Sequence, residues 1–313
     1  MAKKKVRIGQ TIALIPEAGS AIRPEWLLDG QSGNTNFPYS KYKALATVGE
    51  VDAKTKLGLT GYPDGQAAWL LDDNTVRVAY QSESYANVTG TRTPEPETYP
   101  RELKTGVTFT GSRIHTIDYA RDAFADFMGN DSAASDMVKG SGFLFNRAFN
   151  LFGKEVTPKN TDPADLAAKW GNQTLPSGEI VEFGTPLSDA DFFFHSFCGA
   201  WYEPANRYGE GQGFSDDIWL MAEEWDIGED NFAPGVAGEA VANETMGLAA
   251  MAVDVANEVA YSVPALGQTG YEKIAPLNTG ESDYVVVVTA GYNHGQDPAP
   301  LKIYVGRKGY DAE

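Results

Sequence analysis

A single cysteine and a pair of adjacent glutamates are the residues of this chain best suited to chemistry. Cys198 is the one cysteine among 313 residues and follows shortly after three consecutive phenylalanines. Glu223 and Glu224 end the next apolar run, beyond a glycine-rich stretch at 208–214. The two segments are predicted to form a hairpin, and a thiolate and carboxylates on one hairpin could share a metal ion.

Cys198 has three interpretations. Cysteine is among the most buried residue types and often fills a core as a small hydrophobe, which the neighbouring Phe194 and Trp201 favour. A catalytic nucleophile would need a base within hydrogen-bonding reach. His195 lies three residues away, and in a strand that offset points its side chain to the opposite face. A Cys–His pair is therefore disfavoured, and core packing and metal binding stay open.

The Glu223–Glu224 pair stands at the end of a predicted strand that begins at Ile218. Adjacent carboxylates at a strand end are costly unless water or cations surround them. Exposure to solvent is the simple explanation. Cation binding is the alternative, and it is favoured by further acidic residues on both sides, namely Asp216, Asp217, Asp226, Glu229 and Asp230.

Three more carboxylates and two cations are candidate site residues. Asp64 stands in a Pro-Asp-Gly sequence, for which a tight turn is a sufficient explanation. Glu83 ends a predicted strand, and Glu272 follows a glycine-rich turn. Arg307 and Lys308, at the end of the last predicted strand, could bind a phosphate or offset the acidity nearby.

The composition excludes some classes of partner. The net charge is −18 and the pI is about 4.6. No basic patch is present to neutralise phosphates, which argues against nucleic acid and against anionic membrane surfaces. Solubility explains the acidity, and the alternative is that some carboxylates bind a hard cation such as Ca²⁺.

The chain carries no obvious membrane or export segment. Its apolar runs, such as 285–288, are far shorter than a membrane span. A basic start at residues 3–7 is not followed by an apolar region long enough for a signal peptide. One cysteine also excludes a disulfide within the chain. From the residues alone we expect neither a transmembrane segment nor export by a conventional signal.

Short strand-like segments between turn residues predict a mainly β fold. Some pairs are separated by tight polar turns, of which 72–75 is the clearest and 253–257 a weaker candidate. The spacing and the aromatic content suit a β-propeller or a sandwich of antiparallel strands. We expect one β-propeller-like domain over 1–313.

Two segments have helical character within this β pattern. Apolar residues at 120, 123, 124, 127 and 128 lie on one face of a helix with 3.6 residues per turn. Asp162 followed by a proline is a typical helix start. The region around 119–175 is therefore predicted to be a helical insertion that serves packing.

These motifs occur in an order that resembles the PhoX-type alkaline phosphatase family and its uncharacterised relatives. The resemblance covers roughly residue 57 to the end, outside the predicted insertion. It is carried by Pro-Asp-Gly at 63–65 with the strand ending in Glu83, by Phe-Cys-Gly at 197–199, by Glu223–Glu224, by the stretch 251–267, and by Tyr-Val-Gly-Arg-Lys-Gly at 304–309.

The resemblance implies a β-propeller that binds iron and calcium in its central channel and hydrolyses phosphate monoesters. By this similarity Cys198 is a thiolate ligand of Fe³⁺, and the carboxylate ligands of iron and Ca²⁺ are sought among Asp64, Glu83, Glu223, Glu224 and Glu272. The metals would act as Lewis acids on the phosphoryl group. The resemblance also implies a periplasmic or extracellular location, and it identifies no catalytic side chain.

Three departures from the family pattern keep a second function open. Gln81 and Ser82 replace the first two residues of the family's Asn-His-Glu motif, and residues 290–293 replace an Asp-Asp pair. The family also extends beyond the position of Glu313. The chain is then a fragment, a fold completed in another way, or a shortened non-catalytic relative that serves as a structural or surface-assembly protein. The last interpretation predicts a homo-oligomer whose contacts cover open sheet edges.

Overall fold

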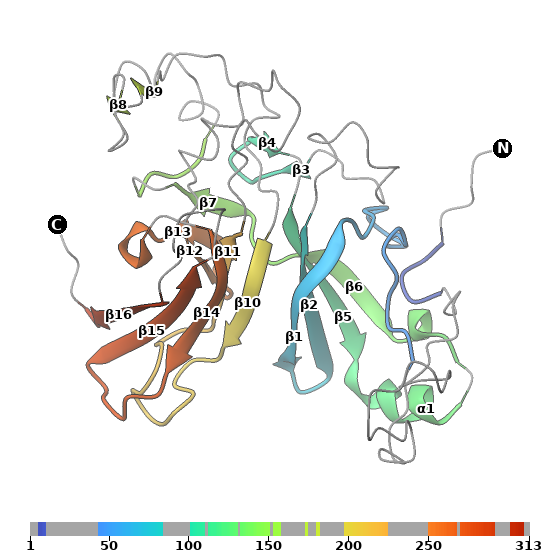
Figure 1. Cartoon of the computed structure of the whole chain (residues 1–313). Coiled ribbons are helices and arrows are strands. Elements are labelled where there is room, and N and C mark those ends of the chain that lie inside the picture. Colours follow the sequence, from blue (N-terminus) through green and yellow to red (C-terminus); the bar gives the residue numbers. More distant parts are fainter. Residues whose placement is uncertain are drawn as a thin grey trace, which may run out of the picture. The chain divides into compact units, whose positions relative to one another are not determined.

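The chain folds mainly into antiparallel β-sheets, as its computed structural model shows (Figure 1). The mainly β fold expected from the sequence is therefore confirmed. The structure describes residues 6–10, 43–83, 101–109, 112–130, 132–150, 153–157, 173–174, 180–181, 197–224, 250–267, 270–291 and 301–309.

The chain forms two compact units. The first comprises 1–59, 68–78 and 117–141, and the second comprises 60–67, 79–116 and 142–313. Four of the five boundaries between the units fall inside strands, and the fifth lies between Leu59 and Thr60. The expectation of one domain over 1–313 stays a prediction.

A four-stranded sheet has the order β1-β2-β5-β6. Its first two strands are joined by the tight turn expected at 72–75. One oxygen of Asp72 accepts the N–H of Asn74 at 2.7 Å, and the other accepts the Thr75 hydroxyl at 2.9 Å. Such side-chain caps are why Asp and Asn favour turns. The strands are β1 (Tyr62–Asp72), β2 (Thr75–Glu83), β5 (Arg113–Ala120) and β6 (Val138–Phe143).

A five-stranded sheet in the second unit has the order β10-β11-β12-β13-β7. Its strands are antiparallel except for β13 and β7, which are parallel. The hairpin turn between β12 and β13 occupies 255–258, close to the weaker turn predicted at 253–257. The strands are β10 (Phe197–Glu203), β11 (Ile218–Glu223), β12 (Ala250–Asp254), β13 (Val259–Ser262) and β7 (Arg147–Phe149).

A three-stranded sheet of the same unit packs against the five-stranded one. Its strands are β14 (Tyr271–Leu277), β15 (Tyr284–Gly291) and β16 (Leu301–Arg307). One buried cluster joins the two sheets, and removing its apolar surface from water stabilises their contact. Its members are Leu220, Ala222, Ala250, Leu266, Tyr271, Ile274 and Val287.

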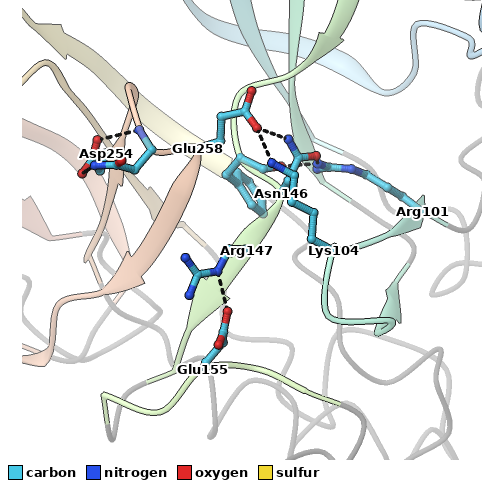
Figure 2. Close-up of polar contacts among 9 residues, drawn as sticks. Arg101, Lys104, Asn146, Arg147, Glu155, Asp254 and Glu258 are labelled. Atoms are coloured by element: carbon cyan, nitrogen blue, oxygen red, sulfur yellow. Dashed lines mark hydrogen bonds and ion pairs between the residues drawn. The ribbon is translucent and has the colours of Figure 1, made fainter.

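A polar network ties the β12–β13 turn to neighbouring segments (Figure 2). The carboxylate of Glu258 accepts hydrogen bonds from Lys104 Nζ at 3.0 Å and from Asn146 Nδ2 at 2.6 Å. Asn146 in turn accepts a hydrogen bond from Arg101 at 2.8 Å. Glu258 has φ 56°, the left-handed region that non-glycine residues rarely adopt. The hydrogen bonds of its side chain help to hold this strained backbone in place.

The predicted helical insertion at 119–175 is wrong over most of its described part. Helical structure there is confined to η3 (Arg121–Ala123), the six-residue α1 (Phe124–Gly129) and η4 (Ala134–Asp136). Strands β6 and β7 follow within the same region. The helix expected after Asp162 lies outside the described residues.

The remaining described elements are short. They are η5 (Pro264–Leu266) and the strand pairs β3 (Arg101–Glu102) with β4 (Thr108–Phe109) and β8 (Gln173–Thr174) with β9 (Ile180–Val181). No helix in the described part of the chain is long and apolar enough to cross a membrane. The described strands form neither a closed barrel nor a ring of blades, so the propeller stays a proposal.

Candidate metal centre

Cys198, Glu224 and Glu272 lie close together in the second unit. The Cys198 sulfur and one carboxylate oxygen of each glutamate all lie within 4.8 Å of one another. Cys198 comes from β10, Glu224 follows β11, and Glu272 belongs to β14. Among the described residues this is the one group of three such ligands that could hold an ion.

A β-bulge in β10 gives Cys198 its position. Cys198 pairs with Ala222 and Trp201 pairs with Leu220, so β10 has one residue more than β11 over this stretch. Gly199 lies in the bulge with φ +67°, and a Cβ there would lie 2.5 Å from the Glu272 carbonyl oxygen. Glycine therefore permits both the left-handed backbone and the close approach of β10 to β14.

A second bulge gives Glu272 its position. Tyr271 pairs with Gly291 and Lys273 with Ala290, which leaves Glu272 as the extra residue of β14. The Cys198 thiol donates to the Glu272 backbone carbonyl at 3.8 Å, so the two bulges face each other. The Lys273 ammonium donates to the Ala200 carbonyl at 2.7 Å and ties the same two strands together.

Asp64 is a neighbour of Cys198 from a third strand. Its carboxylate lies within hydrogen-bonding reach of the Cys198 thiol. The tight turn expected at 63–65 is wrong, because these residues belong to β1. A Cβ on Gly65 would lie 2.1 Å from Cβ of Ala200, so this glycine lets β1 approach β10.

The surroundings of Cys198 raise the pKa of its thiol far above the ordinary value. Burial is the largest cause, and the negative charges of Asp64, Glu224 and Glu272 follow. Both causes disfavour a second anion beside the carboxylates. A bound cation would reverse the effect, because it attracts the thiolate and the carboxylates alike and replaces the proton.

The donors fit a thiolate-binding transition metal better than calcium. Ligands about 2.0–2.3 Å from a shared ion lie up to about 4.5 Å apart, so small side-chain rotations would bring the three donors to one ion. One sulfur with carboxylate oxygens suits iron or zinc. Calcium takes six to eight oxygens, and this cluster offers fewer. The calcium site stays a prediction.

Like Asp64, the candidate carboxylates Glu223 and Glu83 are not members of the group of three. Glu223 is 2% exposed and pairs with Phe197 inside the sheet. Successive side chains of a strand point to opposite faces, and of the adjacent pair only Glu224 joins Cys198. Glu83 ends β2 and is half-buried, outside the group of three.

Arg307 and Lys308 lie at the far end of the C-terminal sheet from Glu272. Leu301 pairs with Ala290, which also pairs with Lys273 beside Glu272. Arg307 is at the other end of β16, about 20 Å along the strand at about 3.3 Å per residue. The Lys308 ammonium donates to the Gly211 carbonyl. The structure therefore does not bring the two cations to the cluster.

Sequence reasoning missed three residues around the cluster. Gln81 hydrogen-bonds Asp64 at 3.1 Å and Trp219 hydrogen-bonds Gln81 at 3.2 Å. Lys273 supplies an exposed positive charge next to Glu272. The one signal for Gln81 was its departure from the family motif. His195, considered above as a base, lies outside the described residues.

Comparison with known proteins identifies no family for this chain. No protein-family model, no curated protein and no solved structure matches it. The likeness to PhoX-type phosphatases therefore rests on the sequence motifs alone.

Proposed function

We propose that this protein is a metal-dependent phosphoester hydrolase whose ion is held by Cys198, Glu224, Glu272 and Asp64. The observation that supports this proposal is the meeting of the Cys198 thiol with the carboxylates of Glu224 and Glu272, with Asp64 of β1 as a neighbour of the thiol. These residues are far apart in the sequence, and two bulged strands bring them together. Iron and zinc both suit this mixture of donors, and iron is the ion that the family resemblance implies.

Each side chain has a separate task in this proposal. The Cys198 thiol is the buried side of the site, Asp64 and Glu224 are both half-buried, and Glu272 is exposed. A phosphate ester can therefore approach from the side of Glu272. When bound, the metal supplies Lewis acidity that polarises a phosphoryl oxygen. The exposed Lys273 ammonium, which donates to the Ala200 carbonyl, adds positive charge to the same two strands and favours an anionic substrate.

Charge balance supports a second cation. The thiolate and two carboxylates of the cluster, together with the neighbouring Asp64, exceed the charge of one Fe³⁺ ion. A phosphate monoester brings further negative charge, so additional cations favour its binding. Calcium, which the family resemblance implies, is the second metal of the proposal, together with a periplasmic or extracellular location.

Metal analysis and hydrolysis of p-nitrophenyl phosphate test the proposal. The protein is supplied with iron and calcium, and Cys198→Ala and Glu272→Gln are expected to lose both iron and activity. Glu281→Gln is the matched control, because Glu281 is an exposed glutamate in the loop between β14 and β15. Bound iron without hydrolysis would refute the enzyme but keep the metal site, and absence of metal would refute both.

A second function has one observation in its favour. Strand β16 is the edge of its sheet, and Leu301, Ile303 and Val305 on one face are 77%, 66% and 57% exposed. An exposed apolar edge strand favours pairing with another chain. A non-catalytic assembly protein would use this edge and form a defined oligomer, whereas a monomer in sedimentation experiments would count against it.

A further inference from the structure

A chain of buried hydrogen bonds ends on Asp64. The indole N–H of Trp219, in β11, donates to Oε1 of Gln81 at 3.2 Å. Nε2 of Gln81, in β2, donates to Oδ2 of Asp64 at 3.1 Å. Trp219 and Gln81 are both 0% exposed, so water does not compete for the contact between them, whereas the Gln81–Asp64 contact is partly buried.

The chemistry of Trp219 fixes the orientation of the Gln81 amide. An indole N–H is a donor only, so the atom that faces it must be the amide oxygen. The amide nitrogen therefore points to Asp64 and cannot exchange places with the oxygen without losing both hydrogen bonds. One oxygen of Asp64, Oδ2, therefore accepts from Gln81, and Asp64 is also a neighbour of the Cys198 thiol.

We propose that Gln81 is a positioning residue, which holds the Asp64 carboxylate toward the metal site through a Trp219–Gln81–Asp64 relay. The inference rests on the proposed metal site. An uncharged amide suits this task, because it orients the carboxylate and does not neutralise it as a lysine or arginine would. The ion therefore meets a carboxylate that is already oriented.

A purely structural role for Gln81 makes a different prediction. In that case Gln81 only satisfies the buried indole N–H, and its loss lowers stability without acting through Asp64. A positioning role requires that the effect of Gln81 on metal affinity disappear once Asp64 can no longer bind the ion. A double-mutant cycle separates the two roles.

Cobalt titration of the metal-free full chain tests the inference. Co²⁺ is the probe, because its thiolate charge-transfer absorption reports ligation by Cys198. Gln81→Met is expected to weaken cobalt binding by about 10- to 100-fold, as loss of a residue that orients a ligand does. In an Asp64→Asn background the same substitution is expected to have less than about a 2-fold effect, because the positioned group is gone.

Two further variants complete the experiment. Ser82→Ala is the control from the same strand as Gln81. It removes a buried hydroxyl that donates to the Arg113 carbonyl, and it should leave cobalt affinity unchanged. Trp219→Phe removes the indole donor but keeps a ring, and it should also weaken cobalt binding. It keeps the inference testable if Gln81→Met does not fold.

The outcomes separate the inference from the proposed function. A wild-type chain that binds no cobalt refutes the metal site. Wild-type binding with an unchanged affinity in Gln81→Met and Trp219→Phe overturns the relay alone. An equal loss of cobalt affinity on Gln81→Met in the wild-type and Asp64→Asn backgrounds also overturns the relay.

Discussion

Gly199→Ala is the substitution that most directly tests how the fold builds the candidate site. Gly199 has φ +67°, and a methyl group there would meet three backbone atoms of β14: the Glu272 oxygen at 2.5 Å, the Glu272 carbon at 3.0 Å and Lys273 Cα at 3.0 Å. Backbone atoms of a paired strand cannot rotate away as a side chain can. Strand β14 must therefore move away from β10.

The expected loss of stability has two parts. A left-handed backbone costs a non-glycine residue about 1–2 kcal/mol, and overpacking in a close-packed region costs about 1–3 kcal/mol. Together they lower the free energy of unfolding by about 2–5 kcal/mol. The same movement separates the Cys198 sulfur from Glu272, so we expect cobalt affinity to fall as well.

Gly280→Ala is the matched control, because it isolates the backbone cost. Gly280 has a similar φ of +74° in the β14–β15 loop, and a Cβ there would meet nothing within 4 Å. Urea unfolding should show a loss of about 1–2 kcal/mol for this variant, and its cobalt affinity should equal that of the wild type. Equal stability losses and equal cobalt affinities in the two variants would refute the close approach of the bulges.

Three further predictions concern stability. Burial and the nearby arginines hold the pKa of His115 well below 6.5, and its Nε2 accepts the Thr60 N–H. The unfolded histidine therefore binds a proton first as the pH falls below about 6.5, and stability then decreases by up to about 1.4 kcal/mol per pH unit. His115→Gln should lack this decrease. Urea unfolding of wild type and variant over a range of pH would contradict the prediction if both lost stability in parallel. Glu258→Gly should be about 1 kcal/mol more stable than Glu258→Ala, because glycine relieves φ 56°, and the reverse order would contradict it. Metal at 100 times its Kd should stabilise the chain by about 2.7 kcal/mol, removable by a chelator, and an unchanged melting temperature would contradict it.

The sequence predicted the β fold and the neighbours of Cys198 for different reasons. Alternation and turn residues are local, so the hairpin at 72–75 could be found directly. The neighbours came from motif order, which named Glu224, Glu272 and Asp64 without giving geometry and equally named Glu83 and Glu223, which lie outside the group of three. The register of the strands, and with it the two bulges, could not be predicted from the sequence, because a bulge depends on which residues of two strands pair.

The errors have equally physical causes. The apolar spacing after residue 119 matches a helix, but among the residues described there only Phe124–Gly129 forms an α-helix, because tertiary pairing extends β5 to Ala120. Strand β6 contains Gly140 and Gly142, which weaken any local strand signal. Gln81 was named only as a departure from a motif, and its partners come from β1 and β11. Such long-range contacts leave no local pattern.

The metal content of the purified protein tests the central claim most directly. Mass spectrometry of the wild-type chain and of Cys198→Ala should show an equimolar amount of iron in the first and none above background in the second. A wild-type chain without a transition metal, or a Cys198→Ala variant that keeps the same iron, would contradict a site built on Cys198, Glu224 and Glu272.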